Sequence, residues 1–191
     1  ASFSDLFVPE SHTYQRTGAP HHDNPLYNPQ TAILCSWTLA AANALGMARG
    51  AMEEFKRMAT QGSTNSPTLM RDRSTTQTTV GECEAIIEAG RSYVLSAVGA
   101  MWESQVGRKE DLMDKAVQAR LAITHGIRQS VLVVDKLFYA AGTGAIHESN
   151  TLERYFRDLH VAGQHISGIH SNYEYAGQVL MGAKITAPTY A

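Results

Sequence analysis

The chain has no run of Lys or Arg and no long apolar stretch, and both absences exclude classes of function. Its 16 basic and 18 acidic residues are scattered and leave a formal net charge of −2, so no basic surface for phosphate backbones or anionic lipids is predicted. No window reaches 18 consecutive apolar residues, and the first five residues lack the pattern of a signal peptide. We therefore expect a soluble, cytoplasmic protein that binds neither nucleic acid nor a membrane.

Cysteine is also scarce, and the common nucleotide and hydrolase motifs are missing. Cys35 and Cys83 each fall inside a helical pattern among apolar neighbours, which favours small buried thiols over a disulfide or a catalytic nucleophile. No P-loop, GxGxxG or GxSxG sequence occurs. Phosphate binding by a glycine-rich loop and serine hydrolysis are thereby excluded.

Four long segments have the apolar spacing of amphipathic helices. The segment after Asn28-Pro29 is also rich in Ala and Gly, so a neighbouring helix is expected to pack closely against it. The other three have recognisable ends. The second is expected to end at Gly107, and the third to run from Glu110-Asp111 to Gly142. The fourth is expected to be capped by Asn150 and to continue through Ile166 to about Gly182. A polar Ser/Thr-rich stretch over 60–79 is expected to be the only long loop.

These elements predict an all-α domain, an antiparallel four-helix bundle over residues 29–191. Residues 1–28 do not fit the pattern, because Phe7-Val8-Pro9-Glu10 is typical of the end of an extended segment. A strand with no sheet to join would leave backbone groups unpaired. We therefore expect residues 1–28 to be the exit segment from an upstream β-domain that these 191 residues do not contain.

Three histidines fall in the expected fourth helix, at His160, His165 and His170. A spacing of five residues turns a helix by about 500°, so successive members of this set would point about 140° apart. Metal ligands on a helix line up at i, i+4 instead. The sequence therefore predicts no metal site.

A more specific signal is the turn Gly142-Thr143-Gly144-Ala145-Ile146, followed by a helix start that ends in Arg157-Asp158. Taken alone, Arg157-Asp158 would be an ordinary surface ion pair. Together with the turn, with Phe7-Val8-Pro9-Glu10 and with the helix order, it resembles the C-terminal helical domain of the acyl-CoA dehydrogenase superfamily. The resemblance covers essentially the whole chain.

The resemblance leaves two chemistries open. Many dehydrogenases of this superfamily place a catalytic Glu about eight residues after the Asp, where this chain has Ile166, which cannot abstract a proton. Glu174 lies farther along, and either it or an upstream residue would be the base of a dehydrogenase that uses FAD on acyl-CoA thioesters. A non-catalytic helical oligomerisation module is a third alternative.

His165 favours the other branch, because its position is similar to that of a histidine in the two-component flavin monooxygenases. An imidazole can hydrogen-bond an oxygen species or accept a phenolic proton near neutral pH. The resemblance implies reduced flavin (FMN or FAD) as cofactor, O₂ as co-substrate, a separate flavin reductase as partner, and hydroxylation of a small aromatic substrate. His165 would be the catalytic residue.

The resemblance also implies flavin contacts at Arg71 or Arg73 and at Gly142 and Gly144, each to the flavin of a neighbouring subunit. The Phe-Gly that usually follows the arginine is replaced here by 74–76, Ser-Thr-Thr, and helix termination is the competing explanation for the glycines. Members of the superfamily form tetramers through their helical domains. Because Trp37, Leu39 and Leu45 extend the apolar surface of the first helix beyond one stripe, we expect a homodimer or homotetramer.

Overall fold

The computed structural model describes residues 4–13, 20, 22–62 and 68–187, and all the regular structure in this part of the chain is helical. The α-helices are α1 (Ala32–Ala59), α2 (Ser74–Val106), α3 (Leu112–Ala141), α4 (Thr151–Gly163) and α5 (Ser171–Leu180). The prediction of an all-α domain is therefore confirmed. Over the same described ranges, no helix combines the length and apolar character needed to span a bilayer.

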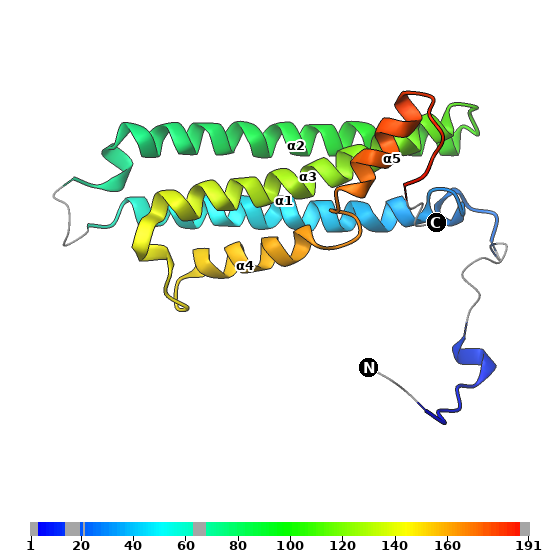
Figure 1. Ribbon diagram of the computed structural model, residues 1–191, viewed down its shortest axis with the longest axis horizontal. Coiled ribbons are helices and arrows are strands. Elements are labelled where there is room, and N and C mark those ends of the chain that lie inside the picture. Colours follow the sequence, from blue (N-terminus) through cyan, green and yellow to red (C-terminus); the bar gives the residue numbers. More distant parts are fainter. Residues whose placement is uncertain (1–3, 14–19, 21, 63–67, 188–191) are drawn as a thin grey trace.

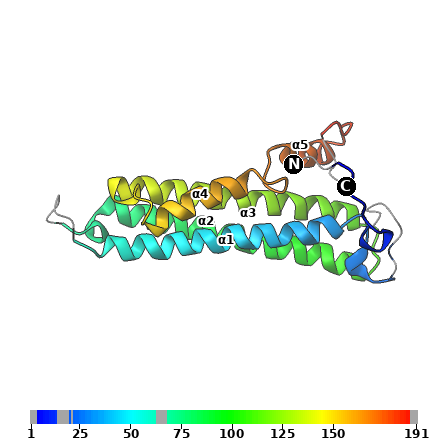
Figure 2. The same ribbon diagram turned by 90° about the horizontal axis from the view of Figure 1, so that it is seen from below.

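The helices α1 to α4 lie side by side and run alternately in opposite directions (Figure 1). The centre of the arrangement is α3, which packs against α1, α2, α4 and α5. Its inward side chains, among them Ile123, Leu137 and Val134, are fully buried. The short α5 lies over the first half of α3, beyond the end of α4 (Figure 2).

Small residues bring α1 close to its neighbours, as the sequence predicts. Ala41, Ala44 and Ala48 have no exposed surface. At Gly50 an added Cβ would lie 2.5 Å from the hydroxyl oxygen of Tyr155 on α4, so only glycine permits this approach. The small-residue stripe is thus explained by helix packing.

Two of the three apolar side chains expected to need a partner subunit are already covered within the chain. Trp37 is only 2% exposed, and the guanidinium carbon of Arg120 lies 5.2 Å from its ring centroid. Leu45 is buried because Gly90 on α2 and Gly126 on α3 leave room for it. Leu39, by contrast, is 72% exposed. The expectation was wrong for these two side chains because the residues that cover them, Arg120 at Trp37 and the two glycines at Leu45, are on other helices and are not visible in the pattern of α1.

The polar stretch is shorter than the sequence suggested, because α2 already begins at Ser74. Its first turns are built from Ser and Thr, which usually favour loops. Here their hydroxyls bond to the helix itself: Thr79 Oγ1 donates to the Thr75 carbonyl oxygen at 3.0 Å. A single 3₁₀ turn, η3 (Met70–Asp72), precedes the helix, and residues 63–67 lie outside the described residues.

The predicted fourth helix is interrupted. The helix α4 ends at Gly163, the chain turns through residues 164–170, and α5 begins at Ser171. Ile166, His165 and His170 therefore lie outside α4, and the argument from helical angles does not apply to them. The turn forms because two glycines let it lie on α3: a Cβ at Gly168 would be 2.9 Å from Ile127 Cγ2.

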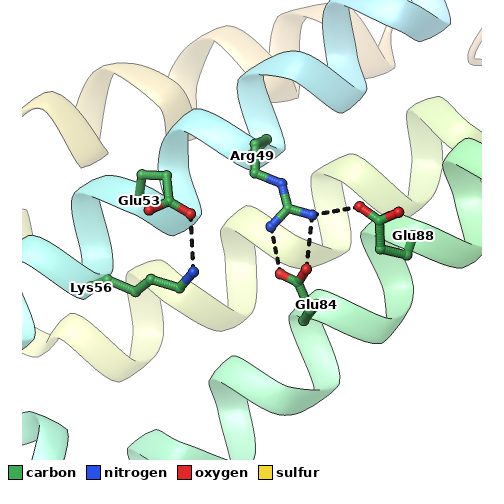
Figure 3. A network of polar contacts seen from close by, with 5 residues as sticks. All are labelled: Arg49, Glu53, Lys56, Glu84 and Glu88. Carbon is green, nitrogen blue, oxygen red and sulfur yellow. Dashed lines mark hydrogen bonds and ion pairs between the residues drawn. The ribbon is translucent and has the colours of Figure 1, made fainter.

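An ion-pair network holds α1 and α2 together on one face of the molecule (Figure 3). Arg49 on α1 donates to both carboxylate oxygens of Glu84 and, at 2.7 Å, to Glu88, both on α2. Lys56 donates to Glu53 within α1 at 3.0 Å. The bidentate contact fixes the rotation of α1 relative to α2.

Candidate functional site

His165 lies in the turn between α4 and α5 and lines an open groove along α1. The groove has a volume of about 460 Å³ and is formed by Ala40, Asn43, Val161, Ala162, Gln164 and His165. Its walls are small or apolar, and its polar side chains are two amides and one imidazole. A flat, mainly apolar molecule with a few hydrogen-bonding groups would suit such a surface.

One ring nitrogen of His165 is bound within the turn. Nδ1 lies 2.7 Å from the hydroxyl oxygen of Ser167, and the Ser167 backbone N–H donates to Nδ1 at 3.3 Å. Among the described residues, Nε2 makes no hydrogen bond. The side chain therefore has a defined inner partner and a second nitrogen available to a ligand.

Buried polar contacts fix the turn to α3. Thr124 Oγ1 donates to the Ser167 carbonyl oxygen at 2.8 Å. Asn172 Nδ2 donates to the Ile166 carbonyl oxygen at 2.9 Å, and Arg120 Nε donates to Asn172 Oδ1 at 3.0 Å. Thr124, Ser167 and Asn172 have no exposed surface. The backbone that carries His165 is thus held on both sides of Ser167 by groups that water cannot replace.

These supporting residues are not apparent from the sequence pattern. Ser167, Thr124 and Asn172 come from three different elements, so no spacing rule connects them. Gly163 and Gly168 lie on either side of the histidine, but glycines even closer together, Gly46 and Gly50, lie inside the continuous helix α1. Glycine spacing alone therefore does not locate the break.

His160 and Glu174 are both placed away from the groove. His160 on α4 stacks on Phe156, its Nδ1 is 2.8 Å from the Phe156 carbonyl oxygen, and its Nε2 is 3.2 Å from Asp135 on α3. Glu174 is exposed on α5 and accepts a hydrogen bond from Gln178. No carboxylate is among the residues that line the groove.

The predicted flavin-contacting arginines lie at the opposite end of α1, where they occupy different surroundings. Arg71 in η3 lines a hollow of about 240 Å³ together with Lys56, Ala59, Thr60, Thr76, Gln77 and Val80. Arg73 precedes α2 and donates to the Thr68 carbonyl oxygen at 3.4 Å. Lys56 and Arg71 lie beside the first turn of α2, whose backbone N–H groups have no helical partner, and such a position favours an anion. Lys56 is paired with Glu53 at 3.0 Å, and Arg71 Nε lies 3.6 Å from Asp72 Oδ1, so an anion here would compete with these carboxylates. Arg71, rather than Arg73, belongs to this hollow.

Gly142 and Gly144 form the 3₁₀ turn η4 (Gly142–Ala145) after α3. Gly142 has φ 62° and ψ −150°, a conformation that residues with a side chain rarely adopt. The Gly144 carbonyl oxygen accepts from Asn150 Nδ2 at 2.8 Å, and this asparagine also caps α4. Termination of α3 and the start of α4 therefore account for this turn locally.

The candidate residues form two groups rather than one site. Asn43 in the His165 groove and Lys56 in the Arg71 hollow are thirteen residues apart on α1, a separation of about 20 Å along the helix. Met58, which lies against Gly144, is not among the residues that line the Arg71 hollow, and its offset of two residues from Lys56 places it about 200° around α1. The glycine turn therefore belongs to neither group. One chain therefore does not bring His165 together with Arg71 and the glycines.

The cysteines are not arranged for catalysis. Burial raises the pKa of Cys83 to about 11, and burial also raises the pKa of the half-buried Cys35. Both thiols are protonated at neutral pH and pack as small apolar groups. Within the ranges that the structure describes, no three His, Cys, Asp or Glu side chains gather as metal ligands.

Two curated relatives are similar to nearly the whole chain. The indole-3-acetate monooxygenase of Acinetobacter baumannii is 26% identical over 97% of this chain and 48% of its own length. The enzyme of the same name from Pseudomonas putida is 27% identical over 93% of this chain and 46% of its own length. The chain thus spans about half the length of the curated relatives it matches.

Solved structures share the fold at lower identity. XiaF from Streptomyces sp., in complex with FADH2 and glycerol, superposes with a TM-score of 0.76 at 23% identity, over 87% of this chain and 42% of that chain. The family model described as "Acyl-CoA dehydrogenase, C-terminal domain" matches residues 38–168, which is more than half of the chain. The chain therefore belongs to the acyl-CoA dehydrogenase C-terminal domain family.

Proposed function

We propose that this chain is the C-terminal helical domain of a monooxygenase that uses reduced flavin and O₂ to hydroxylate a small aromatic substrate. The observation that carries the proposal is His165, held by a buried turn at the wall of an apolar groove that contains no carboxylate. The similarity to two indole-3-acetate monooxygenases supports it. A separate flavin reductase would supply the reduced cofactor, and the protein would be cytoplasmic.

The chain's own residues fit a flavin, either FMN or FAD. The turn at Gly142 and Gly144, which lies against Met58, would be a separate contact, and Lys56, Arg71 and the first turn of α2 would hold a phosphate group. Because this group lies about 20 Å along α1 from the His165 groove, it would serve the flavin of a neighbouring subunit. Leu6 and Phe7 are exposed at 67% and 86%, which supports residues 1–28 as an exit segment from an upstream β-domain.

Reduced flavin would supply the activation of O₂. The protein side of the reaction is orientation: Ala40 and Ala162 give the aromatic ring an apolar wall, and Asn43 and Gln164 offer amide hydrogen bonds at its edge. His165 would hydrogen-bond the substrate or the oxygen being transferred, at a position fixed by the turn. A positioned group of this kind contributes to the rate because its ordering is complete before the reaction.

The dehydrogenase alternative needs a carboxylate base at the substrate. Glu174 is exposed on α5, and position 166 is isoleucine, so neither supplies one to the groove. A non-catalytic oligomerisation module would not require the buried contacts that support His165. Flavin binding by the full-length protein would argue against this alternative, and failure to bind flavin would favour it.

The test is His165→Asn in the full-length protein, supplied with reduced flavin and O₂. Indole-3-acetate is the first aromatic substrate to assay. We expect flavin binding to stay nearly intact while hydroxylation falls by roughly 10²-fold or more, the range for a positioned acid–base group. The ratio of hydroxylated product to released hydrogen peroxide should fall with it.

His160→Asn is the matched control, because His160 is bound to Asp135 and Phe156 and does not line the groove. It should change turnover by much less. If His165→Asn hydroxylates as efficiently as the parent while Glu174→Gln abolishes activity, the dehydrogenase alternative replaces this proposal.

A further inference from the structure

The contacts at His165 Nδ1 determine which of its ring nitrogens carries the proton. A backbone N–H can only donate, and the Ser167 N–H is directed at Nδ1 at 3.3 Å. A proton on Nδ1 would face that N–H, so Nδ1 must accept. The Ser167 hydroxyl, 2.7 Å away, then donates to the same nitrogen. In the neutral imidazole the proton is therefore on Nε2.

We propose that Ser167 is a positioning residue that fixes neutral His165 as the Nε2–H tautomer, so that His165 meets a ligand in the groove as a hydrogen-bond donor. This inference rests on the proposed function for the identity of the ligand. It narrows the role of His165: the side chain donates to an oxygen atom of the substrate or of the species being transferred, and it does not act as the neutral base at that atom.

The surroundings of Ser167 make this arrangement rigid. Ser167 is fully buried, and its carbonyl oxygen accepts from Thr124 Oγ1. The next residue, Gly168, lies so close to α3 that a Cβ would be 2.9 Å from Ile127 Cγ2 and 3.1 Å from the Gly163 carbonyl oxygen. The hydroxyl that contacts Nδ1 is thus held by the core. The imidazole itself is exposed toward the groove.

The experiment measures the tautomer directly by ¹⁵N NMR of histidine-labelled protein, without flavin or turnover. The His165 signals are assigned by their loss in His165→Asn. We expect the Nε2–H tautomer to dominate in the neutral parent. In Ser167→Ala the backbone N–H contact remains and the hydroxyl is lost. The hydroxyl favours the Nε2–H form because in the Nδ1–H form it would accept from Nδ1 and its own buried proton would lose this acceptor, so the ratio of Nε2–H to Nδ1–H should fall by up to about fivefold.

Ser130→Ala is the matched control. Ser130 is also a buried serine, but its hydroxyl donates to the Gly126 carbonyl oxygen inside α3. It should leave the His165 tautomer ratio unchanged. Two results would overturn the inference: a dominant Nδ1–H tautomer in the parent, or a tautomer ratio that Ser167→Ala leaves unchanged. If Ser167→Ala does not fold, the parent spectrum alone is the test.

Turnover supplies the second readout. Ser167→Ala in the full-length protein should lower the ratio of product to hydrogen peroxide while flavin binding is retained, and unchanged coupling despite a shifted tautomer would overturn the positioning role. The two readouts distinguish failure of the proposed function from failure of this inference. If only the proposed function is wrong, the parent hydroxylates no aromatic substrate, but the His165 tautomer ratio still responds to Ser167→Ala.

Discussion

Arg71 and Arg73 are separated by a single residue, yet their guanidinium groups meet different surroundings. Arg71 lines the hollow beside the first turn of α2, together with Lys56 from α1. Arg73 instead donates to the Thr68 carbonyl oxygen. Sequence spacing cannot distinguish them, because the η3 turn decides which side chain faces the hollow. The distinction matters for cofactor binding, since charge-assisted hydrogen bonds to phosphate are among the stronger polar contacts.

Arg71→Gln should therefore weaken flavin binding by the full-length protein by about tenfold or more, as loss of a hydrogen bond to a charged group implies. Arg73→Gln is the control and should change the affinity much less. Both are measured by titration of the protein with flavin. The assignment fails if Arg73→Gln is the more damaging of the two substitutions.

At the scale of elements, the turn between α4 and α5 depends on Gly168. An alanine there would put its Cβ 2.9 Å from Ile127 Cγ2, so the turn or α3 would have to move. We expect Gly168→Ala to lower the free energy of unfolding by about 1–3 kcal/mol, as overpacking does. Hydroxylation should fall as well, because His165 moves with the turn.

Gly81→Ala on α2 is the comparison, since nothing lies within 4 Å of a Cβ there. This substitution should stabilise the helix by about 0.5–1 kcal/mol. Thermal unfolding of both variants tests the difference. Equal midpoints for Gly168→Ala and the parent would contradict the packing argument.

The contact between α1 and α2 should depend on pH through Glu84. Hydrogen bonds from Arg49 lower the pKa of Glu84, with burial acting in the opposite direction. A carboxylate whose pKa is lower in the folded state contributes stability above its unfolded pKa, near 4.3, and this contribution is lost as the pH falls through the folded value. Glu84→Gln should cost less than about 1 kcal/mol at neutral pH, because the pair is partly exposed.

Urea unfolding at pH 7 and at about pH 3 checks the sign. The difference between parent and Glu84→Gln should be largest at pH 7 and should shrink in acid. Glu103→Gln on the same helix is the control, because Glu103 makes no salt bridge among the described residues, and it should show little difference at either pH. A difference for Glu84→Gln that grows in acid would contradict this assignment.

In the molecule as a whole, one exposed surface has the character of a subunit interface. A groove of about 370 Å³ lies between α1 and α2, and the ion-paired Arg49 and Glu88 are among its lining residues. Leu95 at this groove is 59% exposed, and Leu39 is also exposed on α1. Exposed apolar side chains beside a groove are typical of an interface.

We expect the protein to sediment as a dimer or tetramer at micromolar concentration, and Leu95→Lys to shift the distribution toward smaller species. Leu180→Lys on α5 is the control, since Leu180 is similarly exposed at 63% but lies away from this groove. A parent that sediments as a clean monomer would refute the assembly.

Local pattern was enough to predict the helical class and most helix ends. Periodic apolar positions and end signals such as Gly107, Gly142 and Asn150 act within a few residues, so they can be read in sequence. The start of α2 lies earlier than the local pattern predicts: Ser and Thr usually favour loops, but here the Thr79 hydroxyl bonds to the Thr75 carbonyl oxygen of the helix.

Local sequence patterns specify the all-α class, and the resemblance that those patterns carry singles out His165. The place of His165 in a turn, the groove that it lines and the contacts at its Nδ1 depend on how the elements pack. The physical reason is that Ser167, Thr124 and Asn172 act through contacts between elements distant in sequence. The end of α4 at Gly163 is stabilised by packing on α3. The apolar spacing within α4 does not predict this end, because the stabilising contacts come from another helix.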